Sequence, residues 1–155
     1  MTYAPIGFGL SADERGVVAE RWNEHHAMHH LGARVDLLDP AVVQLTVDPV
    51  REYHRGGLGT EAVNGVVMAG MFDLAIGLVG HLAALRRRVG TVQLNIQYLR
   101  PVHGDRFEVM GRLVRSGRTL VFATADLLDQ EGAICARCDG IAAIVGDTPG
   151  EPIAL

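Results

Sequence analysis

The chain has 155 residues, of which 48% are hydrophobic and 21% are charged, and its formal net charge at pH 7 is −4. This composition excludes disorder as the main state and suits one domain over residues 1–155 with a single core. The mild charge gives no broad electrostatic reason to expect nucleic acid or an anionic membrane as a partner. A phosphate-bearing ligand would need local arginines instead.

The N-terminal segment has no basic region followed by a long apolar run, so we expect no secretory signal and a cytoplasmic location. The two cysteines, Cys135 and Cys138, stand three apart in a strand-like stretch. Residues three apart on a strand point to opposite faces, so we expect no shared metal or disulfide. This cysteine usage suits a reducing compartment.

The first predicted element is a helix over about residues 11–29. Ser11 is a plausible N-cap, and Asp13 and Glu14 lie in the first turn. The segment ends in a histidine cluster that places His25 with His29, and His26 with His30, at i,i+4 spacing. Such pairs can bind zinc or nickel, but the sequence supplies no third ligand, so we expect solvated histidines and no metal site.

Two short strands follow over residues 33–38 and 42–47, and a glycine-rich loop over residues 54–59 leads into an apolar segment, residues 63–85. This segment resembles a transmembrane helix in length and is followed by three arginines. Asp73 stands near its middle, however, where a carboxylate is costly in lipid. We therefore predict a buried helix and no membrane association.

After Gly90 the hydrophobic pattern changes to period two, which indicates half-buried strands. Four strands are predicted, over about residues 91–98, 106–115, 119–128 and 134–145. The tail after Gly146 is predicted to be loose. Short turns imply antiparallel neighbours, and a sheet with one apolar face needs a cover. The predicted fold is therefore α+β, an antiparallel sheet wrapped around one long central helix.

Asp73 is the candidate catalytic residue, since the helix has no other ionisable group for two turns on its N-terminal side. A carboxylate inside such a helix is expected to be desolvated, which favours a functional role, although a structural bond to a backbone amide is the alternative. Gly65, Ala69, Asp73 and Gly77 recur every four residues and so share one face of the helix. That face is small except at the acid, which leaves space for a ligand or for close packing.

Asn64 and Gly65 are predicted to lie in the first turn or two of this helix. Unpaired backbone N–H groups and the helix dipole favour negative charge there, as on a thioester carbonyl that becomes an oxyanion. The alternative is that Asn64 only caps the helix.

Residues 64–73, Asn-Gly-Val-Val-Met-Ala-Gly-Met-Phe-Asp, resemble the His-Gly-Gly…Leu-Ala-Asp signature of the phenylacetate-degradation (PaaI-like) hot-dog acyl-CoA thioesterases, in the 4-hydroxybenzoyl-CoA thioesterase superfamily. Residues 91–102 resemble the strand that follows in this family, and the resemblance covers about residues 35–145. It implies a hot-dog fold and hydrolysis of acyl-CoA to free acid and CoA thiol.

The resemblance also implies roles for particular residues. The Gly65 amide would polarise the thioester carbonyl, Asp73 would act as general base or nucleophile, and Thr91 and Asn64 would support them. No metal or separate cofactor is implied, because coenzyme A is part of the substrate. The acyl group would lie among four hydrophobic residues, Val66, Val67, Met68 and Phe72.

Spacing adds an independent point about assembly. Gly65 and Asp73 are eight residues apart, about 12 Å along a helix at 1.5 Å per residue. One thioester carbon cannot lie within roughly 3 Å of both groups. Two antiparallel copies across a two-fold axis bring Gly65 of one to Asp73 of the other, and a monomer is expected to be inactive. The resemblance likewise implies a homodimer with composite sites, often paired into a homotetramer.

The sequence departs from the family at Asn64, where the family has histidine, and at Leu58, where a polar residue is usual. His54 is a candidate to supply the missing polar group. A non-catalytic acyl-CoA sensor, a hot-dog hydratase or dehydratase with His81 as its base, and a structural subunit are the alternatives. The CoA phosphates have several candidate partners, namely Arg86, Arg87, Arg88, Arg100, Arg115 and Arg118.

Overall fold

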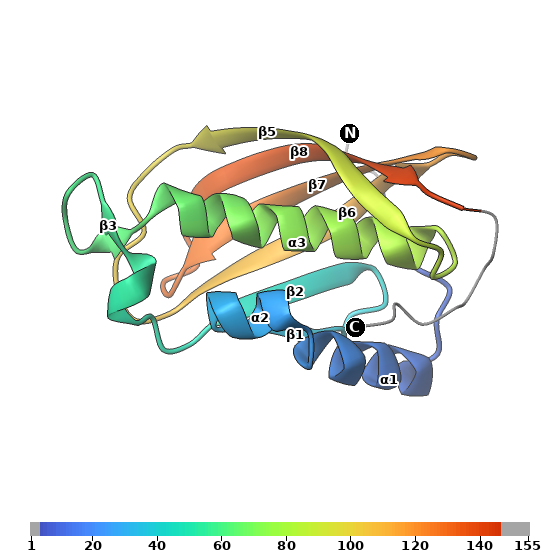
Figure 1. Cartoon of the computed structure of the whole chain (residues 1–155), viewed down its shortest axis with the longest axis horizontal. Coiled ribbons are helices and arrows are strands. Elements are labelled where there is room, and N and C mark those ends of the chain that lie inside the picture. Colours follow the sequence, from blue (N-terminus) through green and yellow to red (C-terminus); the bar gives the residue numbers. More distant parts are fainter. Residues whose placement is uncertain (1–3, 147–155) are drawn as a thin grey trace.

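A computed structural model describes residues 4–146 of the chain. At its centre, a six-stranded antiparallel sheet curves around one long helix, α3 (Gly65–Ala83), as Figure 1 shows. This is the α+β arrangement that the sequence predicted. The tail after residue 146, predicted to be loose, lies outside the described residues.

The sheet contains all six predicted strands, in the spatial order β1-β2-β6-β7-β8-β5. Along β6, β7 and β8 burial alternates, because side chains that face α3 are buried and those on the opposite face are partly exposed. The predicted period of two is therefore confirmed. The strands are β1 (Ala33–Asp36), β2 (Val42–Val47), β5 (Val89–Tyr98), β6 (Phe107–Ser116), β7 (Leu120–Asp129) and β8 (Ile134–Ile144).

Helix α3 is the core helix of the fold. It is long and apolar enough to cross a membrane, yet 61% of its apolar window is buried inside the fold. Its buried side chains, including Met71, Phe72 and Ile76, pack against the concave face of the sheet. The apolar composition of this segment is explained by burial under the strands, as predicted.

Small residues allow α3 to approach β8 closely. A Cβ atom added at Gly140 would lie 2.7 Å from Cγ2 of Ile76, and one added at Gly80 would lie 2.8 Å from Cβ of Ala142. A helical glycine costs about 1 kcal/mol relative to alanine. Gly80 therefore lowers the intrinsic stability of the helix but allows it to pack closely against the sheet.

The N-terminal region forms two helices beside β1 rather than the single predicted one: α1 (Ala12–Asn23) and α2 (His26–Leu31). Ser11 caps α1 in a capping box with Glu14, as expected. The chain then breaks at His25, whose backbone is extended and whose Nδ1 accepts the N–H of Ala27. Because of this cap, His25 and His29 do not share one continuous helix.

Three short elements between β2 and α3 were not predicted. They are a 3-10 turn, η1 (Glu52–His54), and a two-stranded hairpin, β3 (Arg55–Gly57) with β4 (Ala62–Val63). The hairpin includes most of the predicted glycine-rich loop, and α3 begins directly after it.

Cys135 and Cys138 are both buried and belong to the hydrophobic core. A β-bulge changes the pairing register between Leu127 and Leu128, so Cys135 departs from the regular alternation. Burial raises the pKa of both thiols, that of Cys138 to about 11, so both thiols stay protonated near neutral pH.

Strand β5 lies at the edge of the sheet and pairs with β8 alone among the described strands. Tyr98 at its end and Val92 at its bulge are both more than half exposed. An edge strand with exposed apolar side chains is a surface suited to pairing with another chain.

Candidate active site

Asn64 and Gly65 begin α3. Asn64 has extended backbone angles, and its Oδ1 accepts the N–H of Val66 at 2.8 Å, so the structure gives this residue a capping role. Gly65 is the first helical residue, and no acceptor for its N–H is found within residues 4–146. This N–H and the helix dipole together favour a negative charge beside the first turn.

Tyr98 holds the first turn of α3 from the end of β5. Its hydroxyl donates a hydrogen bond to the Gly65 carbonyl oxygen at 3.2 Å. Its ring also packs on the glycine, since a Cβ added at Gly65 would lie 3.8 Å from two ring atoms. Sequence reasoning did not single out Tyr98, which stood there only as the last residue of an alternating strand.

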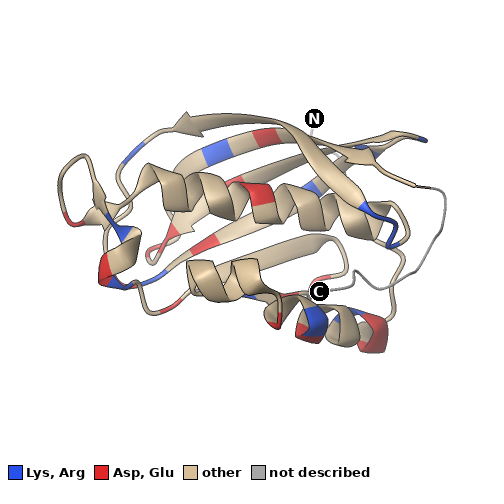
Figure 2. Cartoon of the chain, viewed as in Figure 1, with Lys and Arg blue, Asp and Glu red and all other residues tan. Residues whose placement is uncertain are grey.

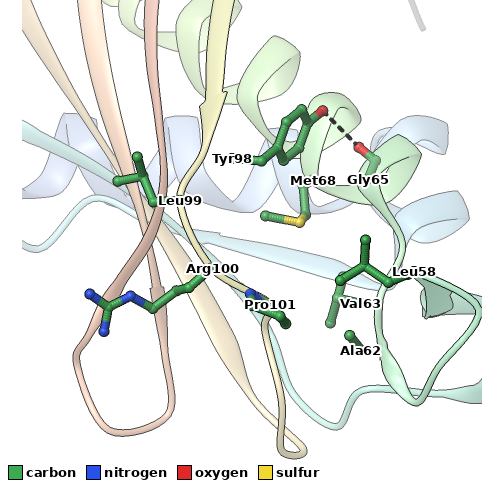
Figure 3. A pocket seen from close by; sticks show the side chains of 10 residues that line it. Leu58, Ala62, Val63, Gly65, Met68, Tyr98, Leu99, Arg100 and Pro101 are labelled. Carbon is green, nitrogen blue, oxygen red and sulfur yellow. Dashed lines mark hydrogen bonds between the residues drawn. The ribbon is translucent and has the colours of Figure 1, made fainter.

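A pocket of about 440 Å³ opens beside this first turn, as Figure 3 shows. Most of its wall is apolar, and Arg100 is its charged lining residue. Such a mostly apolar hollow with a few polar groups is typical of a small-molecule site. The lining residues are Gly57, Leu58, Ala62, Val63, Gly65, Met68, Tyr98, Leu99, Arg100 and Pro101.

Of the four residues predicted to contact the acyl group, the structure brings only Met68 to the pocket. Val67 and Phe72 are buried in the hydrophobic core, on the side of α3 that faces the sheet. Val66 is 80% exposed and lies outside the pocket. Within one chain, Val67 and Phe72 thus lie outside the pocket, and their contact with an acyl group stays a prediction.

Leu58 lies at the pocket with its side chain 83% exposed. Its φ is 57°, a left-handed conformation that costs a non-glycine residue free energy. An exposed leucine in strained backbone offers no polar group to the pocket. The hairpin loop therefore contributes apolar surface to the pocket.

Asp73 lies near the middle of α3 and is the acidic residue of this helix. Its side chain is exposed, which corrects the expectation of a desolvated carboxylate. The sheet covers the opposite side of α3. The predicted face also holds Gly65, Ala69 and Gly77, which are half-buried, so within a single chain this face is only partly covered.

Thr91 lies across from this face on β5. A Cβ added at Gly77 would be 3.7 Å from the Thr91 hydroxyl oxygen, so the threonine stands beside α3 one turn after Asp73. Along one chain the structure therefore separates two groups: Gly65 with the pocket at the start of α3, and Asp73 with Thr91 further along.

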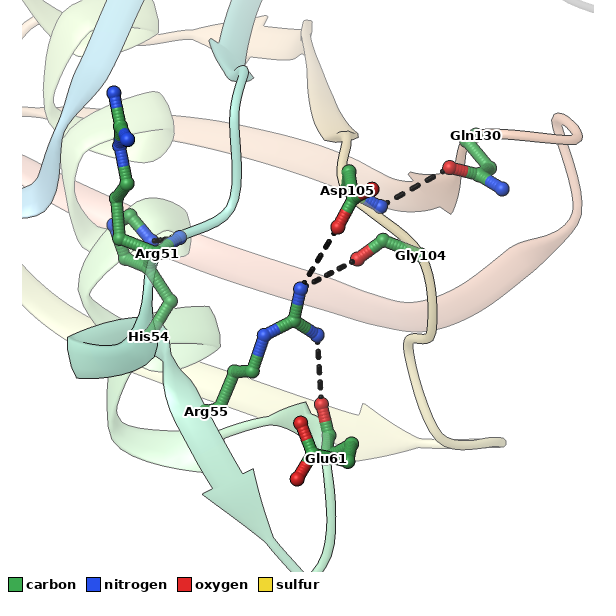
Figure 4. Close-up of polar contacts among 7 residues, drawn as sticks. All are labelled: Arg51, His54, Arg55, Glu61, Gly104, Asp105 and Gln130. Carbon is green, nitrogen blue, oxygen red and sulfur yellow. Dashed lines mark hydrogen bonds and ion pairs between the residues drawn. The ribbon is translucent and has the colours of Figure 1, made fainter.

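His54 does not face the pocket, which corrects its expected role in substrate binding. It is fully buried, its Nδ1 accepts the N–H of Arg51 at 2.7 Å, and its Nε2 donates to the Leu31 carbonyl at 2.8 Å. Both ring nitrogens are thus committed to the backbone. The neighbouring Arg55 binds Asp105 and two carbonyl oxygens, so this loop is tied down from several sides, as Figure 4 shows.

Residues 61–136 match the sequence model of the thioesterase superfamily. A medium/long-chain acyl-CoA thioesterase of Escherichia coli K12, YigI, is 31% identical over 90 residues, which cover 49% of this chain and 58% of that protein. The chain thus spans little more than half the length of this relative.

Solved structures share the fold. The E. coli PaaI protein from the phenylacetic acid degradation operon superimposes with a TM-score of 0.76 at 15% identity, over 90% of this chain and 100% of PaaI. A thioesterase family protein of Silicibacter pomeroyi gives a TM-score of 0.70 at 26% identity, over 83% and 96% of the two chains. These matches confirm the predicted hot-dog fold.

Proposed function

The chain belongs to the thioesterase superfamily, and from this premise we propose that it hydrolyses an acyl-CoA thioester to the free acid and the CoA thiol. The observation that carries the proposal is the start of α3, where the Gly65 N–H stands beside an apolar pocket. A thioester carbonyl bound there would be polarised by this N–H and by the helix dipole. The name of the E. coli relative supports acyl-CoA as the substrate class.

The attacking carboxylate would come from a second copy of the chain. Asp73 does not line the pocket, and it lies about 12 Å along the helix from Gly65 at 1.5 Å per residue. In an antiparallel pair of α3 helices, Gly65 of one copy would face Asp73 of the other. The partly covered face of α3 and the open edge of β5 support a homodimer of this kind, which could pair further into a tetramer.

In the proposed reaction, Asp73 takes a proton from a water molecule while the water oxygen attacks the carbonyl carbon. The carbonyl oxygen becomes an oxyanion that accepts the Gly65 N–H. The C–S bond then breaks, and the thiolate leaves with the proton held by Asp73. Thr91 would orient the water or the acid, and the Asn64 cap would keep the first turn rigid. The carboxylate and the helix N-terminus supply the base and the electrophile, so the scheme needs no metal or further cofactor.

A cytoplasmic acyl-CoA-binding protein without turnover is the second candidate. Leu58 favours it, because this leucine brings an apolar side chain to the pocket where a polar group would help to position water. Such a protein would bind acyl-CoA through the same pocket and release no thiol.

The Gly65 amide can be tested by substitution with proline. Proline is favoured at the first helical position, where it removes the N–H and adds ring carbons, and the extended backbone of Asn64 is compatible with a following proline. Loss of one oxyanion donor is expected to lower kcat by about 10²- to 10³-fold. The control is Gly65→Ala, which keeps the N–H and meets Tyr98 only at ordinary contact distance. Equal turnover by both variants would remove Gly65 from the mechanism.

The carboxylate can be tested with Asp73→Asn, using thiol release from short, long and aromatic acyl-CoAs. We expect a loss of about a hundredfold or more with unchanged thermal stability. Asp139→Asn is the matched control, because Asp139 is also exposed but lies on β8, outside the proposed site. A wild type that acyl-CoA stabilises thermally without thiol release would establish the binding protein instead.

A further inference from the structure

The chain has 14 basic residues, all of them arginines. Several are committed to contacts within the fold. Arg55, Arg106 and Arg137 form ion pairs with carboxylates, whereas Arg15 and Arg87 donate to backbone carbonyls. The guanidinium of Arg100 has no hydrogen-bond or ion-pair partner within residues 4–146.

The backbone of Arg100 is held by hydrogen bonds, whereas its guanidinium forms none with the described residues. The N–H groups of Leu99 and Arg100 both donate to the Cys135 carbonyl, at 2.9 and 3.1 Å, and Pro101 follows with a restricted φ. The stem of Arg100 lines the pocket, and Figure 3 shows its guanidinium extended away from Gly65 and Met68. The hydrogen-bonded backbone at Arg100 thus places the guanidinium at the outer end of the pocket.

Asp129 is close enough for the charge of Arg100 to lower its pKa slightly, but its carboxylate already accepts hydrogen bonds from the backbone. The N–H of Ala133 and the N–H of Glu131 both donate to Asp129 Oδ1, at 2.9 and 3.0 Å. The Ala133 bond is the main reason that the pKa of Asp129 is lowered, and Arg100 contributes least. The carboxylate therefore does not hold the guanidinium in an ion pair.

The other arginines considered for a phosphate lie elsewhere. Arg86, Arg87 and Arg88 follow the C-terminal end of α3 (Figure 2), and the β6–β7 turn with Arg118 adjoins the same end through a bond from Ser116 to Ala83. Nineteen helical residues separate this end from the pocket by about 28 Å at 1.5 Å per residue. Within one chain, only Arg100 of this group lines the pocket beside Gly65.

We propose that Arg100 binds the pyrophosphate of coenzyme A at the outer end of the pocket and thereby selects CoA thioesters over thioesters that lack phosphate. The inference rests on the proposed function, since it requires a thioester carbonyl beside Gly65. The pantetheine arm would then run along the apolar wall formed by Leu99 and Pro101. Guanidinium is suited to this task because its planar array of donors matches two phosphate oxygens at once.

The test compares two substrates with the same acyl group, acyl-CoA and acyl-pantetheine, in the full-length protein. Arg100→Ala should raise KM for acyl-CoA by roughly ten- to hundredfold, the loss expected for one charged hydrogen-bonded contact, and leave kcat nearly unchanged. The KM for acyl-pantetheine should not change, because this substrate has no phosphate. Arg100→Lys should recover part of the affinity as a point charge.

Arg34→Ala is the matched control, because it removes an exposed arginine from β1, at the opposite edge of the sheet from the pocket. It should change neither KM. Product CoA should raise the melting temperature of the wild type and of Arg34→Ala more than that of Arg100→Ala.

The two proposals fail in different ways. If the wild type hydrolyses neither thioester, the proposed function is wrong. If the wild type hydrolyses both thioesters and Arg100→Ala changes both KM values equally or not at all, the proposed thioesterase activity is supported and the role of Arg100 is refuted. A phosphate-dependent loss in Arg86→Ala or Arg118→Ala, with none in Arg100→Ala, would refute the role of Arg100 and assign the phosphate to arginines at the C-terminal end of α3, from the same chain or from the second copy.

Discussion

The Tyr98 hydroxyl donates to the Gly65 carbonyl oxygen, so the last residue of β5 is bound to the first residue of α3. The same glycine lines the pocket, and no acceptor for its N–H is found among the described residues. The edge strand of the sheet therefore sets where the start of the core helix lies relative to a bound carbonyl.

Tyr98→Phe should weaken catalysis without unfolding the protein. The variant keeps the ring on Gly65 and removes one hydrogen bond, worth about 0.5–1.5 kcal/mol. We expect kcat to fall by roughly two- to tenfold with little change in KM or melting temperature. Tyr53→Phe, which removes an exposed hydroxyl beside Gly32, should leave turnover unchanged. A parallel rise in KM would instead make Tyr98 a substrate contact.

His54→Ala should destabilise the fold. The substitution leaves a cavity where a fully buried ring stood and removes the partners of the Arg51 N–H and the Leu31 carbonyl. The free energy of unfolding in denaturant should drop by about 2–4 kcal/mol. His103→Ala changes an exposed histidine and should cost less than about 0.5 kcal/mol. Equal stability of the two variants would contradict the structural role assigned to His54.

His81 should make stability depend on pH. Burial beside Trp22 lowers its pKa below the ordinary 6.5, although a bond to the Arg87 carbonyl opposes the shift. The unfolded chain then binds a proton more readily than the folded one, so the stabilisation is complete above pH 6.5 and is lost as the pH falls through the folded value. His81→Gln stays neutral, and its unfolding free energy should vary less between about pH 8 and pH 5.

Two glycines in helices should respond oppositely to alanine. Gly80→Ala drives a methyl group to within 2.8 Å of Ala142 and should cost about 1–3 kcal/mol of unfolding free energy. Gly16→Ala meets nothing within 4 Å on exposed α1 and should add about 0.5–1 kcal/mol. Thermal or denaturant unfolding of both variants measures the difference, and equal signs would contradict the close contact between α3 and β8.

The sheet and α3 could be predicted because alternation and a long apolar run are strong local signals. The boundary between α1 and α2 could not, since it depends on the side chain of His25 capping the next turn. The residues of α3 that face the sheet were harder to predict, because a helix that is apolar on all sides gives no periodicity to orient it. The exposure of Asp73 and the burial of Phe72 both follow from that orientation.

The pocket could not be predicted from local sequence patterns for another reason. Its walls come from two stretches of the chain, residues 57–68 with the β3–β4 hairpin and the start of α3, and residues 98–101 at the end of β5. His54 lies in the same loop as Leu58, but α2 supplies the Leu31 carbonyl that draws its ring inward. Only tertiary packing separates the residue that lines the pocket from the residue that supports the loop.

The distance between Gly65 and Asp73 along α3 implies that two inactive variants can complement each other. If every site combines Gly65 of one chain with Asp73 of another, Gly65→Pro and Asp73→Asn impair different halves of the same site. A mixed dimer of the two variants then contains one site with both defects and one site with none. Unfolding and refolding the two impaired proteins together should therefore restore about a quarter of the wild-type activity by complementation, whereas each refolded alone stays inactive.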